Sequence, residues 1–376
     1  MCGRTACTLS KCQLRRACQY VDAENNVRLP VWQEPPTNAK DSSKQDDDSE
    51  QGEEKRDDIS TEGGKMGDSS SSLYYPTYNL CPENYCPILL SSTALSSSTE
   101  PASPDTTSSL QSSRVLMPMR WGLIPAWHKG AARSFQYKLI NARLETLTEK
   151  KASCFRHSLA KGRRCVVVTD GFFEWKKTGG ASKIPYFIHA SQQTTNEKSA
   201  FDFSQPDEEE EEERDESKAW TGRRLLMMAG LFDVCDHTKE GDADEKLFSY
   251  AIVTVPASEK LKWLHDRMPA ILDSAEALAD WLDSDNVSNE QALSQLKPVN
   301  SVDYYQVSSA VNNVKCKLPV CVRKVEKVDA ALLSASKKRP KEAPPGQKTI
   351  TSFFQKKQEK PQQSDLKAKR VKKEES

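Results

Sequence analysis

The chain begins Met1-Cys2-Gly3-Arg4, and its second residue can carry out a chemistry that few side chains can. Cysteine is small enough for the initiator methionine to be removed, which would leave a free α-amine beside the thiol. An amine with a pKa of about 8 and a thiol of about 8.5 both keep a deprotonated fraction near neutral pH. Such a pair captures an aldehyde as an imine, which the sulfur closes into a thiazolidine ring. Position alone favours a frayed terminus instead, so the rest of the chain must decide.

Several elements could position this residue. Ser10-x-x-Gln13 matches a capping box and predicts a helix directly after the N-terminal segment. Arg164–Thr169 is a β-branched run, Asp170-Gly171 is a hairpin signal, and Phe172–Lys176 is the expected return strand.

Further along the chain, Phe248–Val255 and Tyr304–Ser308 have the composition of strands, and Asp273-x-x-Glu276 predicts the start of a helix. Strands near hairpin turns with interspersed helices are typical of an α+β domain built on antiparallel sheet. We therefore predict that fold class. Asn141 is predicted to cap a helix that begins around Ala142.

The composition divides the 376 residues into folded and polar parts. Lys plus Arg and Asp plus Glu both number 54, so the net charge is zero. This balance is a cancellation between acidic segments and a basic tail, and the folded part keeps a modest positive excess that suits a polyanion partner. We predict one domain over 2–333 with disordered inserts at about 36–73, 91–113 and 202–217, and a disordered tail over 334–376.

Eleven cysteines without a leading apolar segment favour a reducing compartment. No apolar run is long enough to span a membrane, so no membrane association is predicted. Four residues separate the cysteines of several pairs, a spacing that could suit zinc, but CxxC pairs and clustered histidines are absent from the sequence. We predict no metal and no cofactor, and expect most thiols to be small core residues.

Five segments together resemble the SRAP domain family: Met1–Arg4, Pro118–Pro125, Asn141–Arg143, Asp170–Trp175 and His265–Pro269. The resemblance implies a barrel-like curved sheet with flanking helices. It also implies covalent capture of abasic sites in single-stranded DNA, with a thiazolidine DNA–protein crosslink through Cys2 after Met1 removal. The implied activity is lyase-like, with a proposed peptidase function, low turnover and a monomeric protein.

Three further residues are assigned to catalysis by the same resemblance. Glu174 could act as acid and base, because Phe173 and Trp175 would shield it from water, although an outward residue on an alternating strand is an equally good interpretation of the pattern. His265 could move a proton to the sugar or the imine, or could be a hydrogen-bonded structural histidine. Asn141 could hold the Cys2 amine or a substrate oxygen.

Single-stranded DNA requires cations for its phosphates and flat side chains for its bases. Arg4, Arg120, Arg143 and Arg267 are the predicted DNA contacts. Trp121 and Trp175 are interleaved with them, although a tryptophan is more often buried in a core. The Arg163-Arg164 pair is predicted to form a basic rim.

The tail carries a motif of its own. Gln347, Ile350, Phe353 and Phe354 have the spacing of a sliding-clamp binding box, in which one helical turn places three apolar side chains in a pocket. We therefore expect PCNA as a partner. Lys337–Lys341 and Lys367–Lys373 are typical of nuclear import signals, so a nuclear protein at chromatin and replication forks is predicted. Two other functions stay open, a noncovalent reader of modified or single-stranded DNA and a thiol autopeptidase that uses Cys2.

Overall fold

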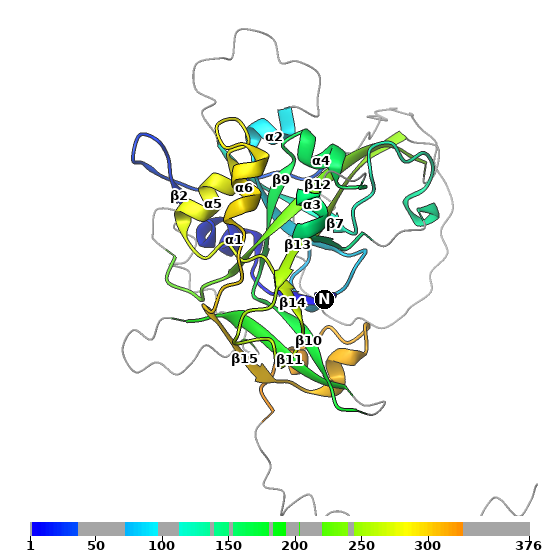
Figure 1. Ribbon diagram of the computed structural model, residues 1–376, viewed down its shortest axis with the longest axis vertical. Coiled ribbons are helices and arrows are strands. Elements are labelled where there is room, and N and C mark those ends of the chain that lie inside the picture. The colour runs from blue at the N-terminus through cyan, green and yellow to red at the C-terminus, as the bar shows by residue number, and fades with distance from the viewer. Residues whose placement is uncertain are drawn as a thin grey trace, which may run out of the picture. The chain divides into compact units, whose positions relative to one another are not determined.

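The computed structural model in Figure 1 describes residues 2–36, 72–96, 113–135, 139–149, 153–179, 183–192, 203, 220–239 and 244–325. The three predicted inserts lie wholly or mostly outside these ranges. The predicted basic tail, with the clamp-binding box and both basic runs, lies entirely outside them. Within the range predicted for the second insert, Ser92–Ser96 forms a short helix (α2).

The larger sheet closes on itself. Its strands are β4 (Val31–Trp32), β6 (Tyr85–Ser91), β7 (Arg114–Trp121), β8 (Asn141–Arg143), β9 (Arg164–Thr169), β12 (Leu226–Lys239), β13 (Asp244–Pro256) and β14 (Arg267–Pro269). They follow the order β14-β13-β12-β9-β6-β7-β4, and β7 also pairs with β13. The extra pairing is parallel, with Ser249 opposite Arg120, and it closes β13, β12, β9, β6 and β7 into a five-stranded barrel.

A second, open sheet carries the N-terminal strand. Its strands are β1 (Thr5–Cys7), β5 (Thr77–Leu80), β10 (Gly171–Lys177), β11 (Lys183–Ala190) and β15 (Val302–Gln306). They follow the order β15-β11-β10-β1-β5, and every neighbouring pair is antiparallel. The chain start is therefore an inner strand of this sheet. A separate two-stranded ribbon joins β2 (Tyr20–Val21) to β3 (Val27–Arg28).

Short helices flank the sheets. They are α1 (Lys11–Ala17), α3 (Leu144–Thr148), α4 (Arg156–Ala160), α5 (Ala275–Leu282) and α6 (Asn289–Gln295), with 3₁₀ turns at Ala132–Ser134, Ser309–Asn312 and Pro319–Cys321. The predicted capping box of α1 is confirmed. The helix predicted from Asp273 is α5, but its N-cap is Ser274, whose side chain accepts from the amide of Ala277. No helix of the described residues is long and apolar enough to cross a membrane.

These elements confirm the predicted α+β class and the mainly antiparallel, barrel-like sheet. The predicted hairpin is wrong. Asp170-Gly171 does not close a hairpin, because β9 pairs in the barrel and β10 pairs in the open sheet, so the dipeptide is the corner where one run of chain passes between sheets. A side chain at 171 would clash there, since a Cβ would lie 2.4 Å from the carbonyl oxygen of Ile188.

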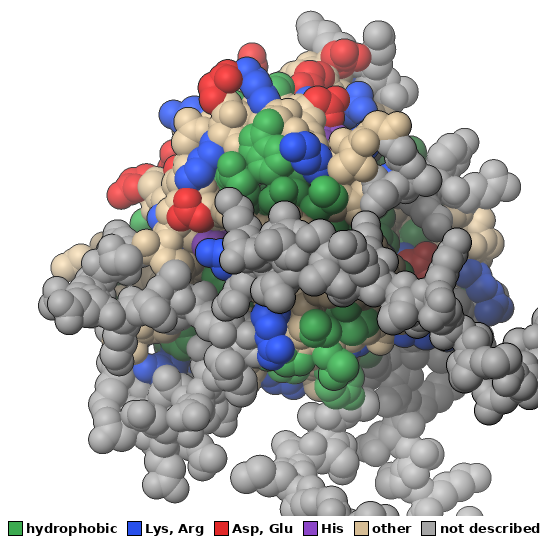
Figure 2. Space-filling model, turned by 90° about the horizontal axis from the view of Figure 1, so that it is seen from below, with side chains coloured by type: hydrophobic (Ala, Val, Ile, Leu, Met, Phe, Trp, Pro, Cys, Tyr) green, Lys and Arg blue, Asp and Glu red, His purple; other side chains and the backbone are tan. Residues whose placement is uncertain are grey.

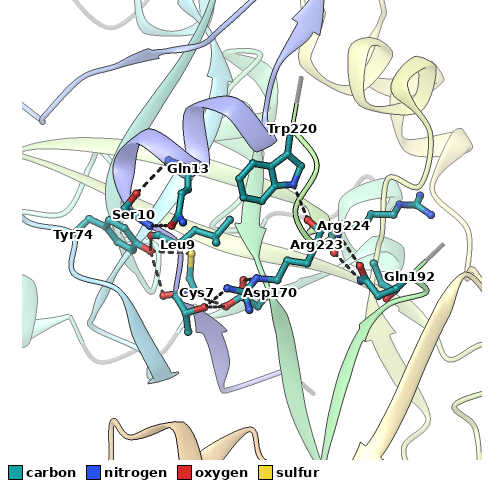
Figure 3. A network of polar contacts seen from close by, with 12 residues as sticks. Cys7, Leu9, Ser10, Gln13, Tyr74, Asp170, Gln192, Trp220, Arg223 and Arg224 are labelled. Carbon is teal, nitrogen blue, oxygen red and sulfur yellow. Dashed lines mark hydrogen bonds and ion pairs between the residues drawn. The ribbon is translucent and has the colours of Figure 1, made fainter. Parts of the chain in front are cut away.

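A buried polar network holds β1 against this corner (Figure 3). The Asp170 carboxylate accepts from the amide and hydroxyl of Thr8, at 2.8 and 2.7 Å, and lies 3.5 Å from Nε of Arg223. The hydroxyl of Tyr74 donates to the carbonyl oxygen of Leu9 at 2.9 Å. Because a buried carboxylate is stable only when it is paired and hydrogen-bonded, this network fixes the path of the chain start.

Two apolar clusters complete the fold. The main core is inside the barrel and extends onto one face of the open sheet, where it includes Phe172 and Ile188. A smaller cluster lies on the opposite face of that sheet, around Phe173 and Phe187. The alternation of Phe172 and Phe173 between them means that β10 is covered on both faces near Glu174.

Candidate active site and nucleic-acid interface

Cys2 lies in the interior of the protein. Its exposed fraction is 1%, and its thiol lies 3.8 Å from the carbonyl oxygen of Arg4. The amide of Phe173 donates to that same oxygen at 2.9 Å, so the chain start continues alongside β10 beyond the last paired residue, Thr5. Burial, followed by the charge of Glu174, raises the pKa of the Cys2 thiol well above its usual range. Cys2 is thus packed, and the frayed-terminus interpretation of this residue is wrong.

Asn141 contacts Cys2 directly. Its side-chain amide donates to the Cys2 carbonyl oxygen at 2.8 Å. The predicted role as a helix cap is wrong, because Asn141 begins β8, which pairs in parallel with β13, and the helix starts only at Leu144. The Asn141 side-chain oxygen is buried and has no hydrogen-bond partner among the described residues. An acceptor is therefore held next to Cys2 without a donor, which is costly unless a ligand or the chain start supplies one.

Glu174 is positioned by β10 and is 7% exposed, so it is not the outward residue that strand alternation alone would allow. Its Oε1 accepts from the amide of Trp175 at 3.1 Å. Its charge raises the pKa of the Cys2 thiol, so the carboxylate lies within electrostatic range of that thiol. A carboxylate here can take a proton from the thiol or amine and return it.

His265 lies in the segment between β13 and β14, with its side chain one quarter exposed. Its Nδ1 accepts from the amide of Arg267 at 3.0 Å and lies 2.7 Å from Oδ1 of Asp266. The first contact suits a ring without a proton on Nδ1 and the second a ring with a proton there, so each tautomer has a partner.

Two buried residues within electrostatic range of Cys2 were missed in the sequence. Tyr250, from β13, and Cys86, from β6, are both fully buried. Burial raises the pKa of the Tyr250 hydroxyl, and the neighbouring Cys86 and Cys2 thiols raise it further. The signal was available in Phe248–Val255, where Tyr250 is the one residue with a phenolic hydroxyl at an inward position.

Among the predicted DNA contacts, Arg4 and Trp175 form one unit. Nη1 of Arg4 donates to Asn79 Oδ1 at 2.9 Å and to the carbonyl oxygen of Val311 at 2.8 Å, and the guanidinium lies 5.8 Å from the Trp175 ring centre. The Trp175 indole donates to Asn312 Oδ1 at 2.7 Å. Both side chains are half-buried, so each keeps a surface that can contact a ligand.

Three more arginines lie at the surface or near it. Arg143 is exposed at the start of α3. Arg120 is half-buried, 3.8 Å from the exposed carboxylate of Glu83. Arg267 is more restrained, because it donates to Glu145 and to the carbonyl oxygen of Thr254, both at 2.6 Å. The end of the molecule seen in Figure 2 shows Lys and Arg side chains next to hydrophobic ones.

The other three predicted DNA contacts are corrected by their burial. Trp121 is 0% exposed, donates to the carbonyl oxygen of Ile140 at 3.0 Å and stacks on Tyr250. Arg163 is buried in an ion pair with Asp233, and Arg164 donates to the carbonyl oxygens at the end of α5 and in the following turn. These side chains satisfy interior groups, so they form neither a stacking platform nor a basic rim.

All eleven cysteines are free thiols, and seven of them are buried, as expected for core residues. No cluster of three His, Cys, Asp or Glu side chains that could hold a metal ion occurs in the described ranges. A cavity of about 280 Å³ lies between α3, α4 and α6, away from the four predicted catalytic residues.

The sequence profile of the family described as SOS response associated peptidase (SRAP) matches residues 1–314. The chain therefore belongs to the SRAP family, and the resemblance found in the sequence is confirmed.

The chain is also similar to individual proteins with known names or structures. The chain is 35% identical over 342 residues to abasic site processing protein HMCES of Xenopus tropicalis, covering 90% of this chain and 83% of that protein. It is 30% identical over 248 residues to abasic site processing protein YoqW of Bacillus subtilis, covering 65% and 85%. A crystal structure of a protein from Bacteroides thetaiotaomicron superposes with a TM-score of 0.46 at 23% identity, covering 69% of this chain and 88% of that one.

Proposed function

We propose that this protein captures abasic sites in single-stranded DNA by forming a thiazolidine crosslink through Cys2. The observation that carries the proposal is the burial of Cys2 beside Asn141, which donates to its carbonyl oxygen, within range of the Glu174 charge, because this places an acceptor and a proton carrier near the aminothiol. The names of the relatives support the substrate class. Removal of Met1 is part of the proposal, since the reaction needs the free α-amine of Cys2.

The raised thiol pKa sets the order of the steps. Burial keeps the thiol protonated near neutral pH, so the amine is the group that attacks the aldehyde of the ring-opened sugar. Loss of water gives an imine. The sulfur then adds to the imine carbon, and its proton passes to the imine nitrogen. The overall reaction consumes one aldehyde, one amine and one thiol, and it releases one water.

Each neighbouring side chain has a defined task in this scheme. Glu174 relays the proton from sulfur to nitrogen, and it helps to open the sugar. The Asn141 amide holds the Cys2 carbonyl, and its unpaired oxygen accepts from the new amine. His265 moves the proton at the sugar hydroxyl and, in reverse, at the adduct, so the crosslink is slowly reversible.

The same pKa direction weakens the autopeptidase alternative, because peptide hydrolysis by cysteine requires a thiolate as the first nucleophile. A noncovalent reader would need no packed aminothiol. Intact-mass measurement of the purified protein, with Met1 present and after its removal, each with and without an abasic single-stranded oligonucleotide, separates the three functions. Capture adds the mass of the oligonucleotide less one water, a peptidase yields cleaved peptide, and a reader changes neither mass. A Cys2→Ser variant, which cannot form the thiazolidine, is the matched control.

The cellular setting is a further part of the proposal. The clamp-binding box around Phe353 and the basic runs of the tail support recruitment by PCNA and a nuclear location at replication forks. There the crosslink would shield an abasic site from strand cleavage. The protein would act as a monomer, and its turnover would be low, since each crosslink consumes the Cys2 aminothiol.

A further inference from the structure

An aromatic cluster outside the predicted site lies at the protein surface. Tyr186 from β11, Tyr304 from β15 and Trp263 from the segment before His265 contact one another. Their ring centres are separated by 5.0 Å for Trp263 and Tyr186, 5.1 Å for Trp263 and Tyr304, and 6.2 Å for Tyr186 and Tyr304. Trp263 is 38% exposed and Tyr304 is 37% exposed. Tyr186 packs against the main core, whereas Trp263 and Tyr304 are not members of either apolar cluster and keep an exposed ring surface.

The cluster is continuous with the candidate active site. Tyr186 lies directly opposite Glu174 in the pairing of β10 with β11, and such partners are neighbours on one face of a sheet. Trp263 precedes His265 by two residues. The turn that carries Trp263 is fixed to β15, because Nζ of Lys260 lies 2.7 Å from Oδ1 of Asp303. The aromatic surface therefore spans from the strand of Glu174 to the segment of His265.

The charge around the cluster is positive on its β10–β11 side. Nζ of Lys176 lies 4.9 Å from the Trp263 ring centre. Lys177 and Lys183 face each other across the same hairpin, and residues 175–190 include no Asp or Glu. Cations beside exposed rings form the combination that binds a single strand, in which phosphates are neutralised while bases stack.

We propose that Trp263, Tyr304 and Tyr186 form a stacking platform for a base that flanks the abasic residue in single-stranded DNA. This rests on the proposed function and extends it. An abasic residue has no base to recognise, so affinity must come from its neighbours. A platform contiguous with Glu174 and His265 would hold one neighbouring base and thereby place the sugar at Cys2. The platform does not read sequence, because every base has a flat face.

The test is a double-mutant cycle that pairs removal of rings with removal of bases. The probe is a single-stranded oligonucleotide with a central tetrahydrofuran residue, which has no aldehyde and cannot crosslink. Its flanking bases are removed one position at a time by further tetrahydrofuran residues. Noncovalent affinity is measured by fluorescence anisotropy for the full chain and for Trp263→Ala with Tyr304→Ala. Trp127→Ala, at another exposed tryptophan (58%), is the matched control.

For the wild-type chain, loss of the base at one flanking position should weaken binding about tenfold, the usual effect of one stacked base. The double Ala variant should bind the probe that keeps all its flanking bases about tenfold more weakly than the wild-type chain does. Removal of the same flanking base should then lower the affinity of the variant only slightly further. If the Ala variant does not unfold cooperatively, Trp263→Leu with Tyr304→Leu, which keeps apolar bulk without flat faces, takes its place. Additive losses or wild-type affinity would overturn the platform.

Crosslinking to an aldehyde-bearing abasic oligonucleotide, measured in parallel on the wild-type chain, separates the two proposals. A coupled loss of affinity without any crosslink would refute capture and keep the platform. A crosslink without coupling between rings and flanking bases would keep capture and refute the platform.

Discussion

Replacing Glu174 with Gln should have opposite effects on two reactions of the same cysteine. The carboxylate is nearly buried, and its charge is the largest cause, after burial, that raises the pKa of the Cys2 thiol. Gln keeps the shape and can still accept from the Trp175 amide, but it carries no charge and cannot relay a proton.

Loss of the proton relay should slow capture about 100-fold, or about 2.7 kcal/mol of activation free energy. The thiol pKa should fall at the same time, because the thiolate no longer faces a carboxylate. It should stay above the usual value, since burial is the main cause and is unchanged. At any pH below that pKa, the variant therefore has more thiolate than the wild-type protein.

Two rates check these expectations in one preparation. Crosslink formation with an abasic oligonucleotide is followed on denaturing gels, and alkylation of Cys2 by iodoacetamide is followed by peptide mass spectrometry over a pH series. Glu174→Gln should lower the first rate and raise the second. Glu276→Gln, in the first turn of α5, is the control and should change neither. Wild-type capture by the Glu174 variant would refute the proton-relay role, and unchanged alkylation would refute the electrostatic one.

Three other variants test separate parts of the molecule. His265→Ala should slow both formation and reversal of the crosslink, so the adduct persists longer in transfer to a fresh oligonucleotide; wild-type rates in both directions would return His265 to a structural role. Phe353→Ala with Phe354→Ala should abolish PCNA binding in a pull-down and leave crosslinking intact, a result that retained binding would contradict. Arg164→Ala should lower the free energy of unfolding by about 3 kcal/mol in urea, because buried carbonyls lose their donors, without weakening DNA binding. Arg143→Ala, at an exposed position, should weaken DNA binding and leave the free energy of unfolding unchanged. If the two variants changed stability and DNA binding in the same way, the buried and exposed assignments would be contradicted.

The sequence predicted those features that local chemistry determines. Local sequence predicted the capping box at Ser10, the strand at Phe248–Val255 and the α+β class. These predictions succeeded because hydrogen-bonding side chains and β-branched runs act over a few residues. The spacing of residues in the sequence could not predict that Cys2 and Glu174 lie near each other. Only the family resemblance predicted that the two residues are close, because they lie 172 positions apart in the sequence.

The errors have tertiary causes. Asp170-Gly171 has hairpin chemistry, but a buried arginine and the close approach of β11 turn it into a corner between sheets. Asn141 has a side chain suited to a helix N-cap, but its backbone pairs with β13 and is therefore part of strand β8. Trp121 was predicted at a DNA surface, although its motif gave no means to tell an inward strand position from an outward one.

The burial of Cys2 is consistent with a site that reacts once. A thiol that is covered and protonated is protected from oxidants and from passing electrophiles, because both react with thiolate. It can still add to an imine that forms on the adjacent amine, since the electrophile is then generated in place and needs no second encounter. An enzyme with rapid turnover would need an accessible nucleophile and a route for product release. Under the proposed capture function neither is needed, so the nucleophile can lie buried just ahead of β1, where the chain start runs alongside β10.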